Sequence, residues 1–156
     1  MTYGADNVMQ FYIPGLYASA GTGPLFSWAT DIHLPGSSQM GLIQSAILDR
    51  GNSTYFTRIP AQDIIVSDAD TDDKHVTAMR DRNGGWIMVF TPTGKSFEIQ
   101  TGGLKGCNVS ASWYDTLVGG YTAFEYAQCG GESTVRVFAP LKTSVNVDWV
   151  LVLEVR

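Results

Sequence analysis

The chain after residue 55 consists of short segments that are rich in β-branched and aromatic residues and are separated by turn residues. Apolar and polar residues alternate within many of them, which is typical of strands that bury one face. Asn83-Gly84-Gly85 indicates a hairpin, and Pro92-Thr93-Gly94 indicates a second turn. The predicted strands are Asp63 to Ser67, His75 to Asp81, Gly85 to Thr91, Ser96 to Gln100, Gly106 to Tyr114, Thr122 to Gln128, Thr134 to Phe138 and Asp148 to Val155. Eight short strands of this kind predict a mainly β protein, an antiparallel β-sandwich.

One helix is predicted before the strands, from about Ser38 to Arg50. Pro35-Gly36 breaks the preceding chain, and a serine can cap the helix. Gly51-Asn52 ends it, because Gly and Asn most readily adopt the positive φ that follows a helix. Its apolar face is formed by Met40, Leu42, Ile43, Ala46, Ile47 and Leu48. We therefore expect an N-terminal arm with one helix, residues 1–54, packed on a β-sandwich, residues 55–156.

The composition excludes two classes of partner. The 156 residues are 44% hydrophobic, which is enough for one core. Fifteen acidic and ten basic residues give a formal charge of -5, and no Lys/Arg cluster is interleaved with aromatics, so no nucleic-acid partner is expected. The longest apolar stretches, such as Trp149 to Leu153, are far too short for a bilayer span, so no membrane partner is expected. No signal peptide is visible, which has no bearing on localisation if a longer precursor was cut.

The two cysteines fall on two of the predicted strands that are neighbours in sequence. A hairpin centred near Val118 would place Cys107 opposite Cys129, where a disulfide can form in an oxidising compartment. Two buried free thiols are the alternative. The sequons that begin at Asn52 and Asn108 are candidates for glycosylation, and they favour a secreted origin and therefore the bridge.

Two ordered series of motifs resemble one protein family. The first resembles the end of the barrel of DUF4038-type (apiosidase-like) glycoside hydrolases: Thr2-Tyr3-Gly4, Gln10-Phe11-Tyr12, Pro14-Gly15 and Leu34-Pro35-Gly36-Ser37-Ser38-Gln39-Met40. The second resembles the C-terminal β-sandwich of those proteins, a module labelled as collagen-binding: Arg58-Ile59-Pro60, His75-Val76-Thr77-Ala78, Gly85-Trp86-Ile87-Met88-Val89-Phe90, Pro92-Thr93-Gly94, Ser112-Trp113-Tyr114-Asp115 and Asp148-Trp149-Val150-Leu151-Val152-Leu153. Met1 stands where such enzymes tend to carry a His, and His33 where an Asp is usual.

The resemblance also implies that this chain lacks a catalytic pair. Glycosidases need two carboxylates that flank the scissile bond, and in this family they are expected on earlier barrel strands that the chain does not contain. Asp6 and Asp31 are the acids of residues 1–35, and both are better explained as turn or N-cap residues. We therefore predict no catalytic residue and no enzyme activity.

No metal or cofactor site is predicted either. The acidic stretch from Asp68 to Asp73 could be a calcium loop, but it lacks the glycine and the distal Glu of an EF-hand, so a solvated turn is the better interpretation. His33 and His75 have no Cys or His at ligand spacing.

Exposed aromatic residues are the remaining binding candidates, because sugar rings stack on Trp and Tyr side chains. Trp86, Trp113 and Trp149 are flanked by apolar residues and are assigned to the core. Trp113 and Tyr114 point to opposite faces of one strand, so one of the two should point outward. The candidate ligand-binding residues are Tyr12, Trp28, Tyr114, Tyr121 and Tyr126.

These features favour a non-catalytic module that binds a glycan or an extracellular-matrix polymer and is secreted. Bracing of a catalytic barrel is an alternative role. A stand-alone structural or signalling homodimer and a truncated hydrolase fragment are further alternatives. A homodimer through residues 1–35 is expected, because a strand that is paired inside a barrel in the family would here have an open edge beside several aromatic residues.

Overall fold

In this computed structural model, the described residues are 42, 45–50, 55–67, 69, 74–127, 134–141 and 148–156. Their strands are β1 (Arg58–Pro60), β2 (Thr77–Asp81), β3 (Trp86–Thr91), β4 (Phe97–Gln100), β5 (Val109–Asp115), β6 (Tyr121–Phe124), β7 (Val135–Phe138) and β8 (Trp149–Val155). Leu42 and residues 45–48 are helical, within the range predicted from the sequence. The prediction of a mainly β, antiparallel fold is confirmed.

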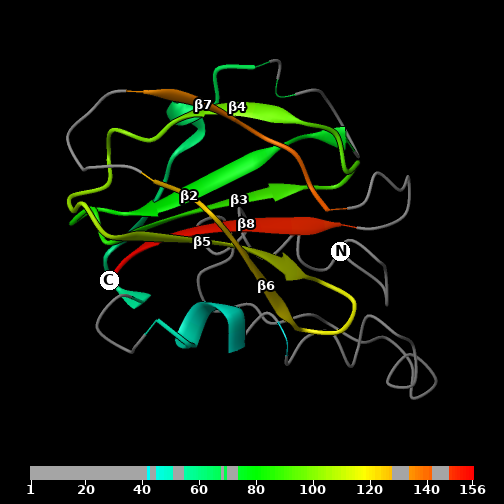
Figure 1. The fold of residues 1–156 in the computed structure, drawn as a ribbon, viewed down its shortest axis with the longest axis horizontal. Coiled ribbons are helices and arrows are strands. Elements are labelled where there is room, and N and C mark those ends of the chain that lie inside the picture. Colours follow the sequence, from blue (N-terminus) through cyan, green and yellow to red (C-terminus); the bar gives the residue numbers. More distant parts are fainter. Residues whose placement is uncertain are drawn as a thin grey trace.

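The strands form two antiparallel sheets. The larger sheet has the order β1-β2-β3-β8-β5-β6, and the smaller one consists of β4 and β7. In Figure 1, β4 and β7 lie above the larger sheet and the helical residues lie below it, so the described part of the protein has three layers. β3 and β8 occupy the centre of the larger sheet, and β6 forms one of its edges.

Each strand predicted from His75 onward corresponds to one observed strand. The strand predicted over Asp63 to Ser67 is wrong, because this segment begins with the 3-10 helix η2 (Gln62–Ile64), followed by a single bridge from Ile65 to Ile99. β1 was not predicted; it pairs with β2, and its three residues are too few to reveal an alternating pattern.

The first core lies between the two sheets. Ile87, Val89, Leu151 and Leu153 point from the centre of the larger sheet toward Phe97, Ile99 and Phe138 of the smaller one, and all are buried. The Trp113 ring lies 6.1 Å from the ring of Phe97 and 6.4 Å from the ring of Trp149, centroid to centroid. Trp86, Trp113 and Trp149 are at most 4% exposed, so their assignment to the core is confirmed.

A second core covers the opposite face of the larger sheet. Met88 and Phe90 of β3, with Val150 and Val152 of β8, pack here with Ala46 and Ile47 of the helical segment. As a result, all six residues of β3 are buried. Strands buried on both faces read as continuous apolar runs, which explains why Trp86 to Phe90 shows no alternation.

The hairpin turn between β2 and β3 is located as predicted. The Asp81 carboxylate accepts hydrogen bonds from the backbone N–H groups of Asn83 at 3.1 Å and Gly85 at 2.9 Å. Burial raises the pKa of Asp81, but hydrogen bonds from Thr57, Asn83 and Gly85 outweigh it and lower the pKa overall. Gly84 has a φ of +83°, and a Cβ there would lie 2.6 Å from the carbonyl oxygen of Gly103, so a glycine is required.

Replacing Leu151 by alanine tests the inter-sheet core. Leu151 is completely buried, so Leu151→Ala should lower the free energy of unfolding by about 3 kcal/mol through lost apolar burial and a residual cavity. The matched control is Leu117→Ala, because Leu117 is 45% exposed on a turn and should change stability by less than about 0.5 kcal/mol. Urea denaturation of both variants makes the comparison, and equal losses would contradict this placement of the core.

Candidate functional site

The pairing of β5 with β6 ends before the start of β5. The register pairs Ala111 with Phe124 and Tyr114 with Tyr121, and it does not extend to Val109. On the other side of β5, the backbone N–H of Arg156 donates to the carbonyl of Asn108 at 2.8 Å. Because backbone groups alternate in direction along a strand, the carbonyl of Val109 points toward the β6 side, where the ladder has already ended. The segment that follows Phe124 thus leaves an opening beside the start of β5.

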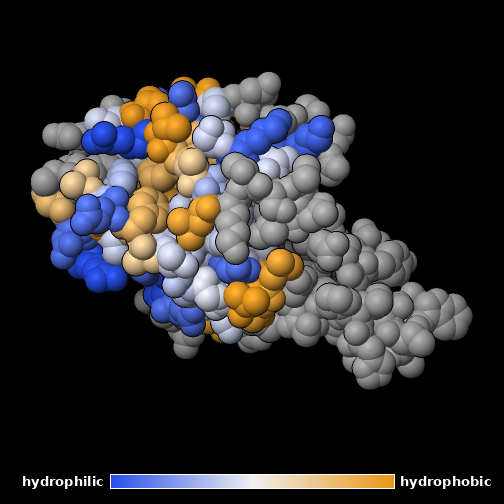
Figure 2. Space-filling model, turned by 45° about the vertical axis from the view of Figure 1, so that its right-hand side comes forward, coloured by the Kyte–Doolittle hydropathy of each residue, from blue (hydrophilic) through white to orange (hydrophobic). Residues whose placement is uncertain are grey.

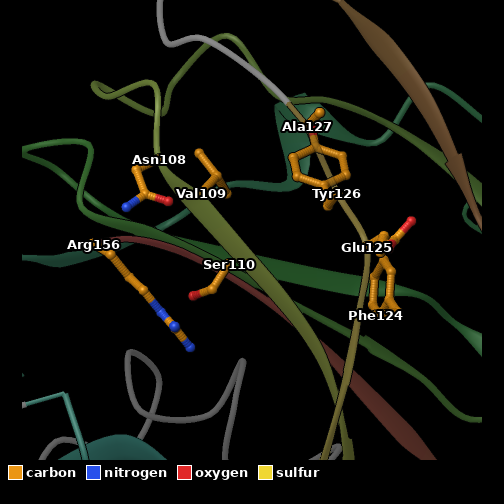
Figure 3. Close-up of a pocket in the computed structure, with 8 residues that line it drawn as sticks. All are labelled: Asn108, Val109, Ser110, Phe124, Glu125, Tyr126, Ala127 and Arg156. Atoms are coloured by element: carbon orange, nitrogen blue, oxygen red, sulfur yellow. The ribbon is translucent and has the colours of Figure 1, made fainter.

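We call this opening the Tyr126 groove. It has a volume of about 630 Å³ and is lined by Asn108, Val109, Ser110, Phe124, Glu125, Tyr126, Ala127 and Arg156. Figure 3 shows Asn108, Ser110 and Arg156 on one side, with Phe124 and Tyr126 across from them. The Tyr126 ring is partly buried, and its centroid lies 5.7 Å from that of Phe138. The groove therefore combines an aromatic wall with a polar wall.

A second depression, the Arg50 hollow, adjoins this groove. It has a volume of about 250 Å³ and is lined by Asp49, Arg50, Ser110, Ala111, Ser112, Tyr121, Ala123, Glu154 and Arg156. Ser110 and Arg156 line both depressions. Ser112 pairs with Ala123. The residues next to them along β5 and β6, such as Trp113 and Phe124, face the inter-sheet core, so Ser112 and Ala123 face the other way. The hollow therefore opens on the helix side of the larger sheet.

Charged groups and one phenol surround the hollow. The Arg50 side chain is only 4% exposed; its Nη1 donates to the carbonyl of Ala46, and its Nε lies 3.9 Å from Oε1 of Glu154. The guanidinium carbon of Arg50 is 5.9 Å from the centroid of the Tyr121 ring. The Tyr121 hydroxyl donates to Oδ2 of Asp49 at 3.4 Å. These contacts hold the Arg50 side chain in place before any ligand arrives.

The predicted ligand-binding residues fall into three groups. Tyr121, which is 42% exposed, lines the Arg50 hollow, and Tyr126 lines the adjoining groove. Tyr114 is 1% exposed and cannot stack on a ligand, so its prediction as a binding residue is wrong. The reason is that both faces of the larger sheet are covered, so neither Trp113 nor Tyr114 points outward. The candidates Tyr12 and Trp28 lie outside the described residues.

The structure also bears on the cysteines and sequons. Cys107 is exposed and carries a free thiol, whereas Cys129 lies outside the described residues. The observed register, with Tyr114 opposite Tyr121, differs by one residue from that of a hairpin centred near Val118, and the bridge between Cys107 and Cys129 stays a prediction. Of the two sequons, Asn108 is exposed and lines the Tyr126 groove, and Asn52 lies outside the described residues.

Among the described residues, no group of three or more His, Cys, Asp or Glu side chains could hold a metal ion. His75 lies beside Gln62, with the two Nε2 atoms 3.4 Å apart. His33 and most of the acidic stretch from Asp68 to Asp73 lie outside the described residues. No helix in the described part of the chain is long and apolar enough to cross a membrane.

Large exposed hydrophobic side chains also occur away from the two depressions. Phe56 is 83% exposed, and exposed valines stand at positions 66, 118, 135 and 137. On the face shown in Figure 2, hydrophobic residues lie in patches bordered by hydrophilic ones. Neither Phe56 nor these valines line the Tyr126 groove or the Arg50 hollow. Among the described residues, the two depressions bring polar side chains together with the exposed ring of Tyr121 and the partly buried ring of Tyr126.

Residues 59–154 match the family described as "Putative collagen-binding domain of a collagenase". The chain belongs to this family. The resemblance inferred from the sequence is thereby confirmed for the β-sandwich. Both depressions of this collagen-binding-domain family member are lined mainly by residues inside the matched range.

Solved structures similar to this family member include a glycoside hydrolase with a TM-score of 0.73 and 21% identity, over 96% of this chain and 36% of that one. A second is a glycoside hydrolase family 5 protein from Bacteroides vulgatus, with a TM-score of 0.69 and 21% identity, over 86% of this chain and 29% of that one. The chain thus spans about a third of the length of these proteins, and the likeness establishes a shared fold. No curated protein matches the sequence.

Tyr114→Phe tests the structural role of Tyr114. Its hydroxyl donates to the carbonyl of Leu42 at 2.9 Å, so the change should lower the free energy of unfolding by about 1 kcal/mol at neutral pH. Burial, with the neighbouring Tyr121 and Asp49, raises the pKa of Tyr114 from 10.0 to about 12. The neutral phenol therefore supports folding fully below pH 10, and this contribution is lost as the pH rises through about 12.

Urea denaturation at neutral pH and in alkaline buffers measures both effects. Tyr121→Phe is the control, because its hydroxyl makes an exposed and longer hydrogen bond, of 3.4 Å. A Tyr114→Phe variant as stable as the parent chain at neutral pH would contradict the assigned role.

Proposed function

We propose that this chain is a non-catalytic module that binds a glycan or another extracellular-matrix polymer across the Tyr126 groove and the Arg50 hollow. The observation that carries this proposal is that Tyr121 and Tyr126 line adjoining depressions that share Ser110 and Arg156. Two neighbouring depressions can hold successive units of one extended chain. A polymer of this class is extracellular, so secretion of the protein is part of the proposal.

The acids near the site support binding rather than hydrolysis. Glu154 lies beside the guanidinium of Arg50, and Asp49 accepts the hydroxyl of Tyr121. Both carboxylates thus make contacts that hold the walls of the hollow together. A glycosidase instead needs two carboxylates that flank the scissile bond and exchange a proton with the substrate.

Replacing the two tyrosines tests the location of the site. Tyr126→Ala and Tyr121→Ala should each weaken binding to an insoluble polymer about three- to tenfold, because each removes an aromatic contact. Co-sedimentation with a panel of insoluble polysaccharides and with fibrillar collagen measures the bound fraction. Phe56→Ala is the matched control, because Phe56 is a more exposed aromatic residue outside both depressions.

Retention that depends on Phe56 as much as on the tyrosines would indicate non-specific adhesion and contradict the proposed site. Failure of the parent chain to bind any polymer of the panel would contradict the proposed function itself.

Bracing of a larger hydrolase is a second candidate function, favoured by a separate observation. Ala46 and Ile47 of the helical segment are buried in the second core. Leu42 contacts the turn after β5, where a Cβ on Gly119 would lie 2.6 Å from Cδ2 of Leu42. The sandwich therefore holds on its back face a segment from the arm that resembles the end of a hydrolase barrel. Binding uses residues at the β6 edge of the larger sheet, whereas bracing uses the buried residues Ala46 and Ile47 and the contact of Leu42, so the two functions are compatible.

A homodimer through residues 1–35 stays a prediction, because those residues lie outside the described part of the chain. Static light scattering on the full chain at micromolar concentrations should give twice the mass of one chain. A single-chain mass at every concentration would contradict the dimer.

A further inference from the structure

We propose that the Arg50 hollow is a subsite for one ring of a neutral sugar, so that the polymer bound by this chain is an uncharged glycan rather than collagen. The inference rests on the proposed function and narrows its ligand class. It draws on the size of the hollow, its charge balance and the exposure of Tyr121.

The size of the hollow suits a single sugar ring. With about 250 Å³, the hollow lies just below the range of pockets that hold drug-sized ligands, so it suits one small ring. Its floor is kept open by Ser112 and Ala123, two small side chains that face each other across β5 and β6. Collagen is a triple helix, which could insert only a protruding side chain into such a hollow. A sugar ring can enter it whole.

The wall of the hollow carries both hydrogen-bond donors and hydrogen-bond acceptors. Arg50 and Arg156 offer only donors, while the carboxylates of Asp49 and Glu154 offer only acceptors. The Ser112 hydroxyl can act in either way. Sugar hydroxyls donate and accept at once, so neighbouring hydroxyls on one ring match a wall that carries both kinds of group. An apolar ligand would use neither kind of group, and a purely acidic ligand would use only the donors.

The charges around the hollow favour a neutral ligand. Two arginines and two carboxylates around one hollow leave no excess of either sign. A uronic acid would bring a carboxylate toward Asp49 and Glu154, and repulsion between like charges opposes its entry. A neutral ring meets no such penalty. The charge balance therefore favours hexose or pentose units over uronates.

The aromatic surface of the hollow is held in place by contacts within the chain. The Tyr121 ring is backed by Tyr114, with 4.7 Å between centroids, and its hydroxyl is tied to Asp49. It nevertheless remains 42% exposed. A ring held in place in this way can stack on the apolar face of a sugar without first losing side-chain freedom.

The test fills the hollow without disturbing the core. Ala123 is exposed on the edge strand β6, and Ala123→Leu should occupy the space meant for the ring. Thr122→Leu is the matched control, since Thr122 is also exposed on β6 but alternates to the opposite face and lines neither depression. Circular dichroism and unfolding midpoints verify that both variants fold.

Isothermal titration of the full chain uses neutral gluco-, xylo-, galacto- and manno-oligosaccharides, oligogalacturonate and a triple-helical collagen peptide. We expect at least one neutral oligosaccharide to bind, Ala123→Leu to weaken this binding about tenfold or more, and Thr122→Leu to leave it unchanged. Ser112→Ala should weaken it by a smaller factor, because it removes one hydrogen-bonding group.

Three outcomes would overturn the inference, and they differ in whether the proposed function survives. If neutral-sugar binding is lost with Tyr126→Ala but unaffected by Ala123→Leu, the subsite in the Arg50 hollow is contradicted, while polymer binding at the Tyr126 groove is supported. Preferential binding of oligogalacturonate or of the collagen peptide removes the neutral ligand class and also keeps the proposed function. Binding of none of the probes overturns both.

Discussion

The central strands of the larger sheet carry large apolar side chains on both faces, so both faces must be covered for the chain to fold. β4 and β7 cover one face, and the helical segment around Ala46 and Ile47 contributes to the cover of the other. The hydrophobic free energy gained by each layer depends on the sheet between them, because neither layer has a comparable apolar partner elsewhere among the described residues. The helical segment and the β-sandwich are therefore expected to fold together, because they share the second core. Tyr114 shows this directly, since its ring lies in the second core and its hydroxyl bonds to Leu42.

The same constraint explains where a ligand can bind. The centre of the larger sheet is closed on both faces, so side chains become available only where the layers end. β6 is an edge strand whose residues are mostly exposed, and it pairs with only part of β5. The Tyr126 groove forms where this pairing stops, and the Arg50 hollow forms where the helical segment ends over the same edge. An open edge is a risk for association with other chains, and occupation of part of it by a ligand would reduce that risk.

Much of the fold was predictable because its signals are local. Turn residues and β-branched segments identified the strands from His75 onward, and Asn83-Gly84-Gly85 identified the hairpin between β2 and β3. The errors have physical causes: β1 is too short for a pattern, and η2 begins beside β-prone isoleucines. The site was only half predictable. Tyr121 and Tyr126 were recognised by residue type, whereas Arg50 and Glu154 gave no signal, because their proximity arises when the helical segment crosses the end of β8. The alternation of Ser110 and Ser112 with Ala111 and Trp113 was the one available clue to a polar patch on the helix side of β5.

The sequence by itself determined the class of fold, the positions of most strands and the family, since all three depend on the order of residue types along the chain. Tertiary structure decided which aromatic residues are free to bind. Trp113 and Tyr114 are adjacent and alternate across the sheet, so sequence alone implied that one is exposed; both are buried because each face has its own cover. It also decided the register of β5 and β6, which differs by one residue from that of a hairpin centred near Val118. The register depends on the number of residues in the turn and on which face of the strand is buried. Packing determines both, and composition does not.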